Sequence, residues 1–184
     1  QIMRERVFAP LGMEDSHYAP LDPVLHGRAA SGHAGGSVIA GKGPVHAESA
    51  AGGFWTTPSD LVRLMIEVTR AYKGITGPVL TPEIVEEMRK TAFWDFGLGF
   101  RVLGEGATLR FCHGGATRGW HGQVHTYPER GQSVAVLTND ADGYAVWPQV
   151  ERGIAQSLGW PGWEPEVVDP TPLGESELAV YTGT

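Results

Sequence analysis

Cysteine, long apolar runs and positive charge are all scarce in this sequence, and each scarcity removes a class of protein. Cysteine occurs once, at Cys112, so the chain cannot form an internal disulfide and indicates no redox compartment. No apolar run approaches the roughly 20 residues that a membrane-spanning helix needs, so no transmembrane segment is predicted. With 14 Lys and Arg against 21 Asp and Glu, the formal net charge is -7, which argues against a nucleic-acid-binding surface.

What is present has the composition of a globular domain. Hydrophobic residues make up 41% and charged residues 19% of the 184 positions, enough apolar material for the core of one domain. The chain begins Gln1-Ile2-Met3-Arg4 without an initiator methionine. It ends at 178–184 in what looks like the start of another element. We therefore expect an internal piece of a longer protein, and no compartment follows from it.

Helix signals occur at four places. Thr57 is a predicted N-cap, with Pro58 at the first helical position and Asp60 three residues after the cap, a variant capping box. The buried stripe of that helix is expected at i, i+3, i+4 and i+7, namely Leu61, Leu64, Met65 and Val68. The other helices are expected at 2–8, from Thr81-Pro82 with Ile84, Val85 and Met88 buried, and at 148–159 with a stripe of Trp147, Val150, Ile154 and Leu158.

Strand signals follow the second strong helix. The predicted strands are separated by short glycine-containing connections, as in an antiparallel meander, and lie at 97–103, 108–113, 121–127 and 132–139. Both faces of the last strand are apolar, so the sheet should be covered on both sides. Residues 14–53 show no sustained period and predict a long loop, and 161–172 predict a linker. The fold class is α+β, an antiparallel sheet flanked by helices.

Three strings carry a resemblance to a known family. The segment 7–16, VFAPLGMEDS, resembles the "PLGM" segment of the serine β-lactamase and penicillin-binding-protein superfamily. The segment 52–61, GGFWTTPSDL, resembles its helix entry, and 113–120, HGGATRGW, resembles its third active-site motif, H-x-G or K-T-G. The superfamily includes class C β-lactamases, DD-peptidases, D-aminopeptidases and related carboxylesterases. The resemblance implies that residues 1–160 are the C-terminal part of a β-lactamase-like, transpeptidase-like domain and that 161–184 are a linker and the start of a further element.

The motif that would supply the nucleophile is absent from the sequence. The family's Ser-x-x-Lys needs a serine three residues before a lysine, but the lysines at 42, 73 and 90 follow Ile39, Arg70 and Glu87. No tyrosine is followed two residues later by asparagine, so the second motif is absent too. The resemblance implies that both motifs lie upstream of the PLGM segment, so truncation explains their absence. An inactive relative with a degenerate site is the alternative.

His113 is the main candidate for catalysis. It is expected to end a strand, and Gly114 and Gly115 would let a substrate approach the main chain closely. The N–H of Ala116 could then point at a developing oxyanion, paired with the N–H of the missing serine. Arg118 and Trp120, which follow the two glycines, could form a pocket wall that holds acyl or carboxylate groups, and Thr117 is expected to bind substrate with them. The other interpretation is a structural histidine, a surface arginine and a packing tryptophan.

The remaining histidines and aromatics favour structural roles. His121 and His125 would share a face of one strand, but four residues at about 3.3 Å each place them roughly 13 Å apart, too far for one metal ion. The histidines at 17, 26, 33 and 46 lie in the irregular stretch, where a solvated loop is favoured over a weak metal site. We therefore predict no metal and no cofactor. The aromatic residues expected in the core are Trp55, Trp94, Phe96 and Phe100.

The function that the resemblance implies is hydrolysis of an ester, peptide or β-lactam through an acyl-serine intermediate. The expected partners are a small-molecule or peptide substrate and the missing N-terminal segment of the same fold. This chain alone should be inactive. The resemblance also implies that esterases, D-aminopeptidases and some DD-peptidases carry histidine at position 113, where β-lactamases carry lysine. The alternative function is a non-catalytic protein that binds a peptide, a cell-wall fragment or a partner protein.

Overall fold

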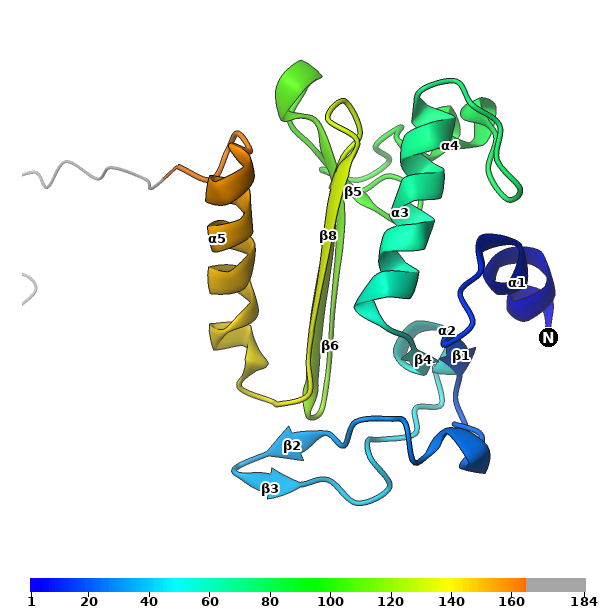
Figure 1. The fold of residues 1–184 in the computed structure, drawn as a ribbon, viewed down its shortest axis with the longest axis vertical. Coiled ribbons are helices and arrows are strands. Elements are labelled where there is room, and N and C mark those ends of the chain that lie inside the picture. The colour runs from blue at the N-terminus through cyan, green and yellow to red at the C-terminus, as the bar shows by residue number, and fades with distance from the viewer. Residues whose placement is uncertain (165–184) are drawn as a thin grey trace, which may run out of the picture.

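A computed structural model describes residues 1–164 and shows a four-stranded antiparallel sheet between helical layers (Figure 1). The strands lie in chain order, β5-β6-β7-β8, as predicted for a meander. Helix α3 packs on one face and helix α5 on the other, which confirms that the sheet is covered on both sides. The bounds are β5 Arg101–Leu103, β6 Arg110–Thr117, β7 Trp120–Tyr127, β8 Gln132–Thr138, α3 Pro58–Tyr72, α4 Pro82–Met88 and α5 Trp147–Leu158.

Strand β6 is longer than the sequence predicts. It continues beyond the expected range 108–113, through the two glycines, and places Gly114 opposite Gln123 of β7. The prediction that His113 ends a strand is therefore wrong. Glycine was interpreted as a turn signal, but a glycine without a side chain can also occupy a ladder position that a neighbouring side chain crowds.

Strand β5 is shorter than the expected range 97–103, because the residues before Arg101 bond to one another and to the end of α4. The loop before β5 also carries exposed aromatic side chains. Trp94 is 84% exposed and Phe96 44% exposed, so their assignment to the core is wrong, whereas Phe100 is buried. Proximity in sequence to a strand does not bury an aromatic ring when the chain leaves the sheet.

Helix α3 begins as predicted. The Thr57 hydroxyl oxygen accepts a hydrogen bond from the N–H of Asp60 at 3.2 Å, which satisfies one of the free donors of the first turn. Its buried side chains Met65 and Val68 pack in the main core between the sheet and α4. The other core members are Ala71, Val85, Phe100, Leu109, Phe111 and Val124.

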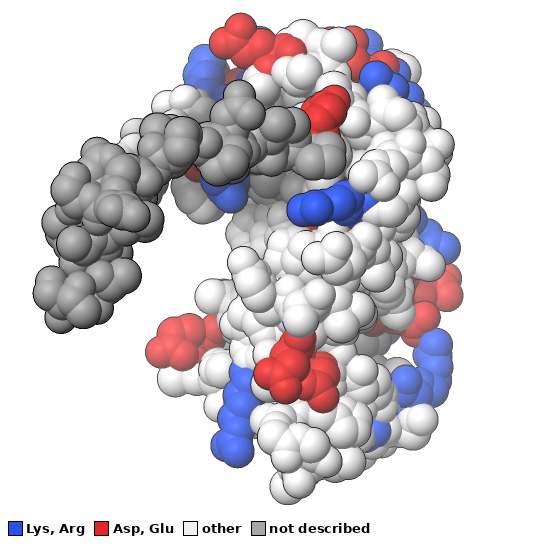
Figure 2. All heavy atoms as spheres, turned by 90° about the vertical axis from the view of Figure 1, so that its left-hand side faces the viewer, with Lys and Arg blue, Asp and Glu red and all other residues white. Residues whose placement is uncertain are grey.

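Helix α5 lies where it was predicted, but its buried side differs from the expected stripe. Val150 and Leu158 are 43% and 44% exposed, whereas Glu151 and Ala155 are fully buried against the sheet. The sequence pattern excluded Glu151 from the core because carboxylates are rarely buried. Figure 2 faces this side of the molecule and shows charged side chains of both signs scattered between broad uncharged areas.

The stretch 14–53, predicted as a loop, contains short elements. They are β1 His17–Tyr18 paired with β4 Phe54–Trp55, β2 His33–Ala34 paired with β3 Ser37–Val38, the 3-10 turn Pro23–Leu25 and α2 Ser49–Gly52. Before it, a π-helical turn Arg4–Phe8 runs into α1 Ala9–Leu11, which ends at Gly12 with a φ of +66°. None of the helices within residues 1–164 has the length and hydropathy of a membrane span. Most of the predicted linker 161–172, and all of 178–184, lie outside the described residues.

Candidate active site

The third recognised string forms the end of β6 and the turn that leads into β7. Strands β6 and β7 are joined by a two-residue turn, Arg118-Gly119, so that Thr117 pairs with Trp120. Gly119 has a φ of +84° and is buried, and a Cβ there would lie 2.4 Å from Cδ1 of Ile39. Only glycine fits this position, because the conformation and the packing against the segment 33–39 both exclude a side chain.

One edge of β6 is open where the string begins. Strand β5 pairs with Arg110, Phe111 and Cys112, and within residues 1–164 no strand pairs with this edge beyond them. His113, Gly114, Gly115 and Ala116 are all exposed. The predicted catalytic residues therefore lie together, on a free strand edge rather than in a turn.

The hydrogen bonding of β5 shows which main-chain groups face this edge. The N–H of Val102 donates to the carbonyl of Asp95 at 2.7 Å and so points away from β6. The preceding residue of β5, Arg101, therefore directs its N–H and C=O toward β6. Its partner in β6 is Cys112, whose N–H and C=O point back toward β5. Because these groups alternate along a strand, Gly114 and Ala116 direct theirs into the open edge. The N–H that was predicted to bind an oxyanion is thus unpaired by the sheet.

The side chains of β6 alternate between two environments. Phe111 packs in the core beneath α3, so His113 and Gly115 lie on the same face of the strand. Gly115 has open space there, since a Cβ would meet nothing within 4 Å. Cys112, Gly114 and Ala116 face the α5 layer instead. A substrate at the edge would therefore meet the His113 imidazole on one face only.

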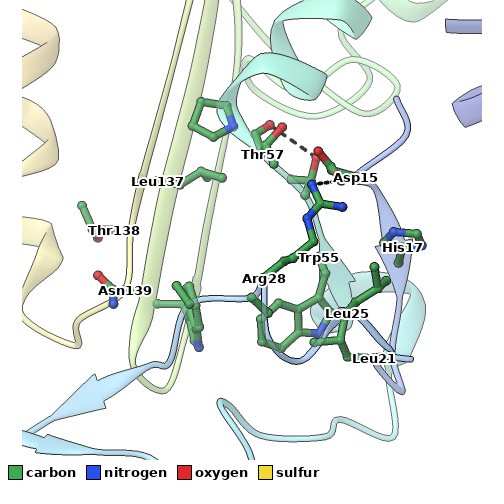
Figure 3. Close-up of a pocket in the computed structure, with 15 residues that line it drawn as sticks. Asp15, His17, Leu21, Leu25, Arg28, Trp55, Thr57, Leu137, Thr138 and Asn139 are labelled. Atoms are coloured by element: carbon green, nitrogen blue, oxygen red, sulfur yellow. Dashed lines mark hydrogen bonds and ion pairs between the residues drawn. The ribbon is translucent and has the colours of Figure 1, made fainter. Parts of the chain in front are cut away.

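Trp120 and Arg118 do not share one wall. The Trp120 indole N–H donates to the carbonyl of Lys42 at 3.2 Å, and its ring packs edge-on to Trp55 at 5.3 Å. Trp120 also lines a cavity of about 310 Å³ beside the start of α3, which none of residues 113–118 lines. Figure 3 shows this cavity, with Arg28 reaching Asp15 in an ion pair of 2.7 Å. Arg118 is exposed at the hairpin tip and has no ion pair within residues 1–164.

Two of the recognised strings are joined by one buried carboxylate. Oδ2 of Asp60 accepts from the N–H of Asp15 at 3.0 Å and from the hydroxyl of Ser16 at 2.9 Å. Oδ1 accepts from Arg63 at 2.6 Å. The carboxylate predicted for a capping box therefore reaches out of the helix and holds the PLGM segment against α3. This gives a physical reason for the two strings to occur together.

The histidines make separate contacts. His121 and His125 lie on β7 as predicted, His121 next to the carbonyl of Ala141 at 2.9 Å and His125 next to Glu151 at 3.3 Å. Among residues 1–164, no three His, Cys, Asp or Glu side chains come close enough to hold a metal ion together. Sequence reasoning missed Glu151. The only signal was a carboxylate on the inner side of an amphipathic helix, which is ambiguous without the sheet in place.

Comparisons with solved structures identify the fold. Similar structures include SurE, at 23% identity and a TM-score of 0.66 over 93% of this chain and 43% of that one. The octameric penicillin-binding protein homologue from Pyrococcus abyssi matches at 18% identity and a TM-score of 0.62, over 86% of this chain and 37% of that one. D-amino acid amidase from Ochrobactrum anthropi SV3 matches at 24% identity and a TM-score of 0.63, over 84% and 53%.

The chain spans 43% and 37% of the length of the first two of these structures, so it contains part of their fold. No curated protein sequence matches it. A family model described as β-lactamase matches residues 1–158, which include the PLGM segment, the α3 entry and the open edge of β6. The chain therefore belongs to the β-lactamase family.

Proposed function

We propose that this chain forms the substrate-binding edge of a serine hydrolase that acts through an acyl-serine intermediate. Membership of the β-lactamase family supports a hydrolase activity. The observation that carries the proposal is the free edge at Gly114 and Ala116, whose main-chain groups point outward and whose neighbour Gly115 has no side chain. An extended substrate can add to such an edge as a strand.

In this proposal the nucleophile belongs to residues that precede Gln1 in the parent protein. Its serine oxygen attacks the substrate carbonyl, and the carbonyl oxygen becomes an oxyanion. The Ala116 N–H donates a hydrogen bond to that oxygen, together with the N–H of the serine. The leaving group then departs with the proton that the serine has lost. Water hydrolyses the acyl-enzyme, which releases the acid and returns a proton to the serine. His113 lies beside the reacting bond on the α3 face, and Thr117 at the end of the same strand and Arg118 in the turn after it lie toward the substrate's far end.

His113 favours esters or peptides over β-lactams as substrates. A lysine at this position would carry a permanent charge that attracts the β-lactam carboxylate, whereas a histidine brings no permanent charge. We expect the full-length protein to hydrolyse short activated esters with a much higher kcat/KM than a chromogenic cephalosporin. The reverse preference would contradict this substrate assignment.

The oxyanion role of Ala116 is tested by removing its N–H. Ala116→Pro deletes the donor, and because that donor faces the open edge, no sheet hydrogen bond is lost. In the full-length protein kcat should fall about a hundredfold or more, as expected for loss of one oxyanion donor. Ala116→Ser keeps the N–H and should retain most of the activity. Gly115→Val should also lower kcat, because its branches enter the open space beside the substrate while the extended backbone tolerates them.

The same preparation tests the proposal as a whole. An active protein should give a burst of product and a covalent adduct in the mass spectrum. If a well-folded full-length protein gives neither and instead binds a peptide or cell-wall fragment without turnover, the non-catalytic alternative holds. Equal kcat values for well-folded Ala116→Pro and wild type would remove this edge from the reaction centre.

A further inference from the structure

A buried polar cluster lies behind the open edge, on the α5 face of the sheet. Glu151 of α5 is fully buried, and its Oε2 is 3.3 Å from Nε2 of His125, which is itself buried. Gln123, two residues earlier on β7, places its amide nitrogen 3.0 Å from the same His125 nitrogen. The cluster is separated from the substrate face by the thickness of the sheet, so it does not contact a bound substrate.

Burying these groups is costly unless they hold one another. Within residues 1–164 neither carboxylate oxygen of Glu151 has a hydrogen-bond partner, and the His125 contact is at ion-pair distance. The amide nitrogen of Gln123 can only donate, so Nε2 of His125 accepts its hydrogen bond. Glu151 packs against the same nitrogen from α5 and restricts the imidazole, which in turn holds the amide of Gln123 in place.

The other end of that amide meets the reactive strand. Oε1 of Gln123 lies 2.2 Å from the position that a Cβ of Gly114 would take. The oxygen therefore fills the space on the α5 face where a side chain of Gly114 would lie. The two glycines of the string differ in this respect, because a Cβ at Gly115 would meet open space. Substrate approach accounts for Gly115, whereas Gly114 accommodates Gln123.

We propose that Gln123 is a positioning residue, clamped by His125 and Glu151, that sets the placement of the β6 edge at Gly114 and Ala116. The inference rests on the proposed function, since it assigns the cluster a role in that reaction. On its open side β6 pairs with no strand beyond Cys112 within residues 1–164, so this part of the edge is held by the ladder to β7 and by the contact with Gln123. A small displacement of a donor in a reaction centre can cost about a hundredfold in rate.

The test is kinetic and uses the full-length protein. Gln123→Ala should lower kcat with an activated ester by about tenfold to a hundredfold. KM should stay within about twofold, because the substrate still binds the same groups. Val136→Ala is the matched control: Val136 pairs with Gln123 from β8, on the far side from β6, and its truncation should leave kcat unchanged. If the alanine variant does not fold, Gln123→Asn replaces it, because its side chain is one methylene shorter and its amide no longer reaches the same position. We expect the same fall in kcat.

A double-mutant cycle on melting temperature tests the contact without activity. Gly114→Ala should lower Tm clearly in the wild type and much less in the Gln123→Ala background, because the oxygen that the new methyl meets is gone. Additive Tm changes would overturn the inference, and so would an unchanged kcat in Gln123→Ala when the wild type is active. Either result leaves the proposed function standing. A full-length wild type without turnover or acyl adduct would instead overturn the proposed function, and the positioning role with it.

Discussion

At the scale of single residues, Asp60 joins two segments that are distant in sequence. Its carboxylate is buried and accepts from Asp15, Ser16 and Arg63. Asp60→Ala would remove the acceptor of the half-buried Asp15 N–H and of the Ser16 hydroxyl, which keeps the Thr56 hydroxyl as a neighbour at 2.8 Å. We expect it to lower the free energy of unfolding by about 1 to 3 kcal/mol. Urea denaturation of the full-length protein measures this.

Arg63→Ala serves as the control for Asp60. The Arg63 side chain is 48% exposed although its partner carboxylate is buried, and its removal leaves the hydrogen bonds from Asp15 and Ser16 in place. Its loss should therefore cost less than the loss of Asp60, about 1 kcal/mol. If the two variants were equally destabilised, the ion pair with Arg63 and not the link to the PLGM segment would hold this corner together.

Cys112 should be a silent thiol in the native protein. Burial raises its pKa, and the nearby Arg101 and Arg110 lower it only in part. The pKa of Cys112 is higher in the folded than in the unfolded protein, so the buried neutral thiol contributes fully to the free energy of unfolding below the unfolded pKa of about 8.5. That contribution is lost as the pH rises through the folded pKa. We expect iodoacetamide to label Cys112 slowly at pH 8.5 in native protein and rapidly in urea. The stability of wild type should also fall relative to Cys112→Ala above that pH.

At the scale of elements, local signals predicted most of the frame. The cap at Thr57, the order of the strands and the covering of both sheet faces followed from residue spacing alone. The pairing of β1 with β4 did not, because His17 and Trp55 are brought together by contacts that no local pattern records. The same limit applies to the site. The string at 113–116 was found, but Gln123 and Glu151 acquire their roles only when the sheet and α5 meet.

The β6–β7 turn offers a test of how the edge is held. Gly119→Ala puts a side chain at a positive φ and within 2.4 Å of Ile39, and should cost about 2 to 4 kcal/mol of stability from strain and overlap together. Gly74→Ala is the control, because its φ of +83° is nearly the same as that of Gly119 but nothing lies within 4 Å of the added Cβ. This control should lose only the stability that an L-residue costs in the left-handed conformation, about 1 kcal/mol. Thermal melts distinguish the two, and equal losses would mean that the packing at the hairpin tip is loose.

At the scale of the whole molecule, strand β8 is an open edge. It pairs only with β7 among residues 1–164, and by alternation along the ladder the N–H of Ala135 faces outward. On the same side of the sheet as α5, Val150 and Leu158 are exposed. We expect residues 1–184 produced alone to self-associate, because an open strand edge and exposed apolar side chains both invite contacts with a second copy.

Sedimentation velocity over a range of concentrations measures this association. Ala135→Pro removes the outward donor without removing a ladder bond, so it should reduce association through the edge. Val150→Glu should reduce association through the helix face. A cooperatively melting monomer at all concentrations would show that the chain is self-sufficient.

The chain alone should also be catalytically inactive. No serine in it precedes a lysine by three residues, and loss of the nucleophile removes most of the rate enhancement in such enzymes. An activated ester and a chromogenic cephalosporin are suitable substrates. A stoichiometric burst with a covalent adduct on residues 1–184 would contradict both the inactivity and the placement of the nucleophile outside this chain.

The alternation of β6 has a consequence for how this protein could be diversified. His113, Gly115 and Thr117 lie on the α3 face of β6, which is the face on which we propose that the substrate meets His113. On the other face, Gln123 occupies the space where a Cβ of Gly114 would lie, and Cys112 is buried. Selectivity can therefore vary at every second residue while the intervening ones keep the strand in place. A combinatorial library randomised at 113, 115 and 117 should retain a large share of well-folded clones. One randomised at 112 and 114 should lose nearly all of them before any new substrate is tried.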